Sequence, residues 1–78
     1  MSQELIKSAR ESVTAAEGAI SRLNTQIQEL RADISKTSDE ARRKRLETLL
    51  KDVQALAARA QEQRSRALSD LERYGAKR

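Results

Sequence analysis

Residues 6–34 read IKSARESVTAAEGAISRLNTQIQELRADI, and this stretch decides the fold. Nine of its apolar residues follow one another at alternating steps of three and four residues: Ile6, Ala9, Val13, Ala16, Ile20, Leu23, Ile27, Leu30 and Ile34. A spacing that averages about 3.5 residues places them along one narrow face of a helix, which another helix must cover. The stretch therefore predicts a long helix over about residues 3–35 that packs lengthwise on a second helix.

The pattern stops at residues 35–40, which read SKTSDE and contain no apolar residue. Thr37 and Glu40 have the spacing of a capping box, a pair of side chains that opens many helices. Beyond this point the apolar residues no longer follow the heptad of the first helix, so the pattern restarts in a new phase. We expect a turn at about residues 35–39 and a second helix over about residues 39–74, ended by Gly75.

Two long helices joined by a short turn predict an all-α helical hairpin with antiparallel, coiled-coil-like packing, in a single domain over residues 1–78. If the chain folds back tightly, facing residues have numbers that sum to about 76. That register pairs large residues near the turn, such as Leu30 with Leu46, and small ones near the open end, such as Ala9 with Ala67. The alternative is a continuous helix, with two chains paired as one extended rod.

The second helix has a wider apolar face than the first. Several of its apolar residues recur at 11-residue spacing, which is typical of a straight or slightly right-handed helix. In the expected register, four residues lie beside the row that faces the first helix, where they are predicted to bind protein: Leu50, Ala57, Leu68 and Leu71. The simplest way to bury these four residues is to pack them against a second copy of the chain, in a homodimeric four-helix bundle. Tyr74 either anchors a partner or closes the end of the seam.

The composition limits the chemistry. The 78 residues include no Cys and no His, so no disulfide, thiolate or imidazole ligand, or histidine base is available. We therefore expect no enzyme activity, no catalytic residue, and no cofactor or metal. The longest apolar run is far shorter than a membrane span, and the N-terminus lacks the apolar core of a signal peptide. The predicted location is the cytoplasm, without a membrane partner.

The net charge of +4 is unevenly divided. Residues 1–36 hold five basic and five acidic residues, whereas residues 37–78 hold eleven basic and seven acidic residues. Near the start of the second helix, where the positive helix end disfavours cations, stands a basic cluster: Arg42, Arg43, Lys44 and Arg45. Such a local inconsistency marks a candidate contact for phosphates or an acidic protein surface. The alternative interpretation is a solvated helix start with pairs such as Arg43 to Glu47.

These patterns together predict a non-enzymatic protein–protein interaction module that acts by stoichiometric binding through its helix faces, as an adaptor, chaperone, assembly factor or inhibitor does. The expected partners are a second copy of the chain and an unidentified protein. The alternative is a helical-bundle regulator that binds RNA or DNA through the basic cluster. Against that alternative, no aromatic residue lies among the cations to stack on bases.

Overall fold

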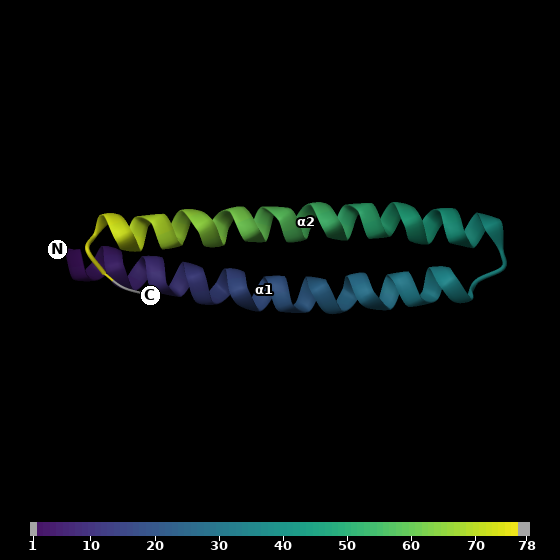
Figure 1. Ribbon diagram of the computed structural model, residues 1–78, viewed down its shortest axis with the longest axis horizontal. Coiled ribbons are helices and arrows are strands. Elements are labelled where there is room, and N and C mark those ends of the chain that lie inside the picture. Colours follow the sequence, from purple (N-terminus) through teal and green to yellow (C-terminus); the bar gives the residue numbers. More distant parts are fainter. Residues whose placement is uncertain (1, 77–78) are drawn as a thin grey trace.

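The computed structural model describes residues 2–76, which form two helices, α1 (Ser2–Lys36) and α2 (Glu40–Arg73). The helices lie side by side, run in opposite directions and form a rod with extents of 57 × 14 × 14 Å (Figure 1). The predicted all-α hairpin is confirmed, and the alternative of one continuous rod is wrong. Each observed helix end differs by one residue from the predicted end.

The turn between the helices is closed by Asp39. As the N-cap of α2, its Oδ1 accepts hydrogen bonds from the amides of Ala41 and Arg42, at 3.1 and 3.5 Å. The amide of Thr37 donates instead to a carbonyl in the last turn of α1, so Thr37 belongs to the end of that helix. The predicted capping box of Thr37 and Glu40 is therefore wrong. Asp39 directly precedes the first helical residue, and its carboxylate satisfies the free amides.

This assignment of the cap is testable. Replacing Asp39 by Ala removes the acceptor for two amides and a negative charge at the positive end of α2, so we expect the free energy of unfolding to fall by about 1 kcal/mol. Thr37→Ala is the matched control and should cost less than half as much. Urea unfolding followed by circular dichroism measures both, and a larger loss for Thr37→Ala would restore the capping box.

The far end of α2 is closed by Gly75, as the sequence predicted. Gly75 has a φ of 74°, a left-handed conformation that glycine adopts without steric cost. Its amide donates to the carbonyl of Glu72 at 3.0 Å, and the amide of Ala76 donates to the carbonyl of Leu71 at 2.9 Å. These two hydrogen bonds form a Schellman motif, which brings Ala76 against the core cluster that contains Leu71.

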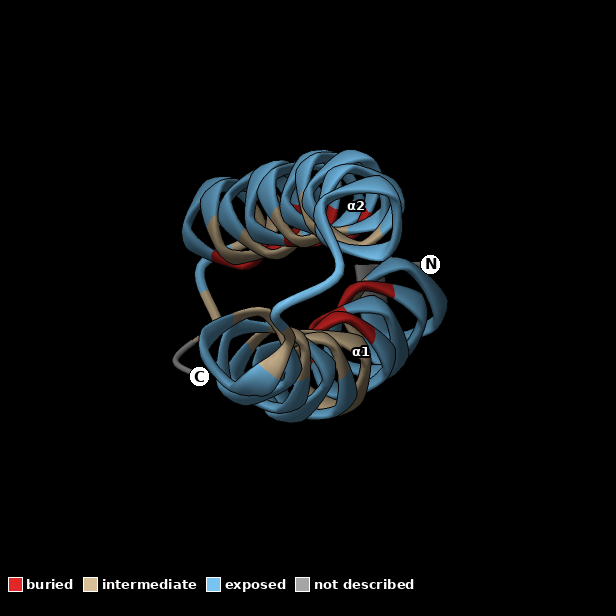
Figure 2. Ribbon diagram, turned by 90° about the vertical axis from the view of Figure 1, so that its right-hand side faces the viewer, coloured by how far each residue is buried: buried red, intermediate tan, exposed pale blue. Residues whose placement is uncertain are grey.

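The apolar row of α1 faces α2, as predicted. All nine of its residues are buried or half-buried, and Ala9, Val13 and Ala16 are buried. Viewed from one end, the buried and half-buried parts of the two helices turn toward each other (Figure 2). One core cluster joins Ala9 and Val13 to Ala67 and Leu71, so it lies in the half of the rod away from the turn.

The face of α2 differs from the predicted one. Its seam residues step by four and three residues in alternation, and all of them are buried or half-buried: Leu46, Leu50, Val53, Ala57, Ala60, Arg64, Ala67, Leu71 and Tyr74. This is a heptad pattern, so the interpretation as an 11-residue repeat is wrong. The physical reason lies in α1, because a helix with a 3.5-residue seam stays in contact only with a helix that has the same period.

The register differs too. An ion pair joins Glu17 to Arg64, and the two seams match when facing residues have numbers that sum to about 80 rather than 76. The first turn of α2 therefore extends past the end of α1 (Figure 1). In this register Ala9 lies level with Leu71, and Leu23 with Ala57. From the level of Ala9 to the level of Leu23, large residues therefore meet small ones, which contradicts the predicted pairing of small with small.

Candidate protein-binding face

The residues predicted to form a protein-binding surface on α2 do not form an outer face. Leu71 is only 1% exposed, the lowest fraction in the core, and lies between the helices. Leu50 and Ala57 are half-buried in the seam, while Leu68 and Tyr74 are half-buried and pack against the core cluster. For Leu50, Ala57 and Leu71 the predicted placement beside the seam is therefore wrong, because it relied on the incorrect register, whereas Leu68 does lie beside the seam. Tyr74 packs against the core cluster and also lines the groove between the helices, so both of its interpretations stay open.

The large apolar side chains that do face solvent on α2 are Leu49 and Leu56, each 49% exposed. We call them the leucine pair. They stand seven residues apart, so they lie on the same side of the helix, next to the seam. The expected register, in which facing numbers sum to about 76, would turn them toward Ile27 and Ile20 of α1, and the observed register moves them outward. Half-exposed leucines at heptad spacing are typical of a helix face that contacts another helix.

The same side of the rod is hollowed in its other half. A groove with a volume of about 500 Å³ runs between the helices and is lined by Leu5, Ser8, Ala9, Ser12, Ala15, Ala16, Gln63, Arg66, Ala67, Asp70 and Tyr74. Its buried floor consists of Ala9, Ala16 and Ala67. Because alanine fills less space than the leucines and isoleucines nearer the turn, the seam is shallower here, and serine side chains on α1 leave it open.

Heptad spacing places the leucine pair and the groove on one side of the molecule. Gln63 and Asp70, which line the groove, follow Leu56 at intervals of seven residues. One row of α2 thus carries two protruding leucines toward the turn and a groove wall toward the open end. This combination is not visible as a motif in the sequence, because it depends on the register between the helices.

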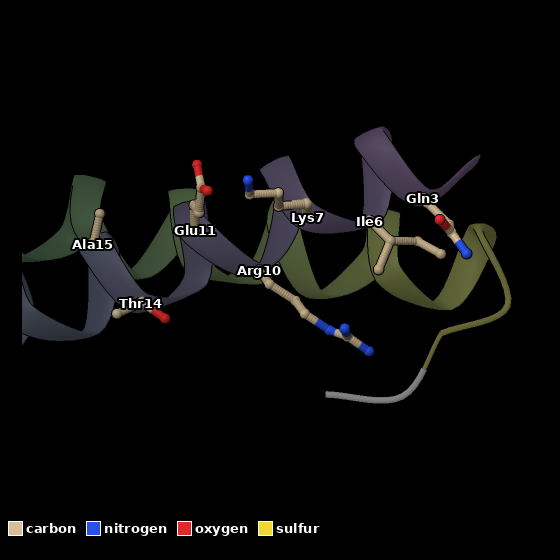
Figure 3. Close-up of a pocket in the computed structure, with 7 residues that line it drawn as sticks. All are labelled: Gln3, Ile6, Lys7, Arg10, Glu11, Thr14 and Ala15. Carbon is tan, nitrogen blue, oxygen red and sulfur yellow. The ribbon is translucent and has the colours of Figure 1, made fainter. Parts of the chain in front are cut away.

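A larger concavity of about 750 Å³ lies on the outside of α1 (Figure 3). All seven of its lining residues belong to this one helix: Gln3, Ile6, Lys7, Arg10, Glu11, Thr14 and Ala15. In Figure 3, Lys7 and Glu11 extend to one side of the helix and Arg10 extends to the other. No side chain of α2 is among the lining residues, so the polar groups do not converge on a common point as they do in a binding pocket.

One residue of the basic cluster, Arg43, contacts the end of α1. Nη2 of Arg43 donates to the carbonyl oxygen of Thr37 at 2.8 Å, so this cation binds the C-terminal end of α1. The carbonyls there carry partial negative charge, which offsets the cost of placing cations at the start of α2. This contact accounts for Arg43 within the fold, whereas a functional role of Arg42, Lys44 and Arg45 stays a prediction. All four cations are exposed, and successive helical positions spread them around the helix rather than over one patch.

Glu17 and Arg64 form the ion pair between the helices. The Nε atom of Arg64 lies 3.0 Å from Oε2 of Glu17, and the two side chains are 29% and 36% exposed. Arg64 occupies a seam position that a leucine or alanine would fill elsewhere on α2. A charged residue at such a position favours one alignment of the helices, since it must find its partner and reach water.

Over residues 2–76, neither helix contains a segment long and apolar enough to cross a membrane. In the same part of the chain, no group of three or more Asp, Glu, His or Cys residues is arranged to hold a metal ion. The chain matches no protein-family model, no curated protein and no solved structure.

Proposed function

We propose that this protein is a non-enzymatic interaction module that binds other protein chains stoichiometrically through the side of the hairpin that carries the leucine pair. The observation that supports this function is the half-exposure of Leu49 and Leu56 on one helix face. Each buries only part of its apolar surface within the hairpin, and covering the remainder by another helix would be favourable by roughly 1 kcal/mol per leucine.

The chemistry of the chain agrees with a binding role. The sequence has no His or Cys for general-base or nucleophilic catalysis at neutral pH. Of the two concavities described above, the one of about 500 Å³ is a groove between the helices, and the one of about 750 Å³ is lined by α1 alone. Extended helix faces of this kind suit helix-on-helix recognition.

The test is an affinity pull-down with the tagged full chain from its native host, with partners identified by mass spectrometry. We expect capture of a partner in a fixed molar ratio by the wild type, and at least tenfold less capture by the double variant Leu49→Ser, Leu56→Ser. The matched control is Ala55→Ser, Ala58→Ser, which changes two exposed residues elsewhere on α2 and should leave capture unchanged.

Two outcomes would contradict the proposal. The first is equal capture by the wild type and the leucine variant, which would remove the leucine pair from the binding face. The second is capture that disappears after nuclease treatment, which would favour the alternative of RNA or DNA binding. Circular dichroism of each variant shows whether the hairpin remains folded, so that a loss of capture can be assigned to the surface.

A further inference from the structure

We propose that the leucine pair of one molecule inserts into the alanine-floored groove of a second copy, and the reverse, in a two-fold symmetric dimer whose chains run antiparallel. This inference rests on the proposed function and names the occupant of the face. Its evidence is that one side of the rod carries both a protruding apolar feature and a hollow with an apolar floor. An isologous interface needs just such a self-complementary surface.

The two features lie in opposite halves of the rod. In the observed register, Leu49 and Leu56 are level with about residues 31 and 24 of α1, whereas the groove is lined by residues 5–16 of α1. A two-fold axis across the rod near its middle exchanges these halves. It brings both leucines of each copy over the groove of the other, so the interface closes with two molecules and leaves neither feature uncovered.

The charges beside the leucines agree with this arrangement. Asp52 stands between the two leucines along α2, and Arg66 lies on the rim of the groove. The same axis places Asp52 opposite the other copy's Arg66, twice in the dimer. Within residues 2–76 of its own chain, Arg66 forms an exposed ion pair with Glu62 at 3.9 Å, which is easily exchanged. Arg59 lies midway between these two residues in the same row, so the axis places it beside its own copy, and its long side chain must turn toward the edge of the interface.

The available area is sufficient for a stable dimer. A side of the rod measures 57 by 14 Å, so full-length contact covers roughly 800 Å² on each copy. Specific protein–protein interfaces bury about this much surface per partner. A second copy of equal length covers the whole side, including the groove and the leucine pair together.

The first test is the mass of the purified protein in solution, measured by light scattering and analytical ultracentrifugation over a wide concentration range. We expect a dimer for the wild type and a dissociation constant roughly a hundredfold higher for Leu49→Ser, Leu56→Ser. Ala55→Ser, Ala58→Ser is the control that should remain dimeric. A monomer at every concentration would overturn the inference but not the proposed function, which the pull-down tests separately.

A charge exchange tests the geometry. Asp52→Arg and Arg66→Asp should each weaken the dimer by about tenfold, and the double variant should restore it to near the wild-type dissociation constant. The two positions are 14 residues apart on one helix, about 21 Å, so the rescue can occur only between copies. A dimer that withstands the leucine changes, or a double variant no tighter than the single ones, would refute this pairing.

Discussion

Replacing Leu71 by Ala is expected to lower the free energy of unfolding by about 3 kcal/mol, more than truncation of any other leucine in the chain. Leu71 is 1% exposed and lies at the centre of the cluster with Ala9, Val13 and Ala67. Alanine neighbours cannot move in to fill the space, so the lost apolar contact and the cavity both contribute. Ala76 also packs against this cluster at the end of α2, so it loses apolar contact when the side chain is shortened.

The matched control is Leu49→Ala, the same truncation at a position that is 49% exposed. It should cost less than about 1 kcal/mol when unfolding is followed at the lowest protein concentration that circular dichroism allows, where association contributes least. Urea unfolding of both variants gives the comparison. Equal losses would mean that α2 is rotated about its axis relative to the structure, toward the orientation that the leucine positions in the sequence suggested.

The sequence was sufficient to predict a two-helix hairpin, because the apolar pattern and the break at residues 35–40 both indicated it. The unbroken alternation from Ile6 to Ile34 predicted one seam, and the loss of phase at residues 35–40 predicted the turn. Each predicted helix end is within one residue of the observed one, since Gly75 and the polar turn leave little choice of boundary. Strong periodicity of this kind is determined locally, before the helices meet.

The face of α2 could not be read in the same way. Leu49 and Leu56 lie just outside its seam, while Arg64 lies within it, so residue type and burial disagree at these positions. A prediction based on the positions of bulky apolar residues therefore chose the wrong row of α2 as the one that faces α1. The available signal was the requirement that α2 share the heptad period of α1, which holds from Leu46 to Tyr74 if a single arginine is accepted.

The candidate site depended on that same choice. With the expected register, the leucine pair faces α1 and Leu71 faces outward; with the observed one, their positions are exchanged. A shift of four in the sum of facing residue numbers was enough to move the exposed apolar surface to a different side of α2. Function on a helix face is therefore predicted less securely than the helix itself, because the face depends on contacts between segments far apart in the chain.

Arg64 gives the second large expected effect, in the opposite direction. Arg64→Leu should raise the free energy of unfolding by about 1 to 2 kcal/mol, because a leucine at this seam position buries apolar surface next to Ala60 and Ala67. The cost is the loss of one part-exposed ion pair, which contributes less than about 1 kcal/mol. The side chain of Glu17 is 36% exposed, so its carboxylate keeps access to water in this variant.

Lys51→Leu adds the same side chain at an exposed position of α2, in the same row as Ala58 and away from the leucine pair, and should change the stability little, so it separates seam burial from a general effect of added leucine. Glu17→Ala completes the set: it removes the ion pair but leaves Arg64 able to reach water, and we expect a loss below about 1 kcal/mol. Thermal and urea unfolding measure all three variants. If Arg64→Leu proved less stable than the wild type, the ion pair would outweigh apolar burial, and Arg64 would stabilise the hairpin as well as align its helices.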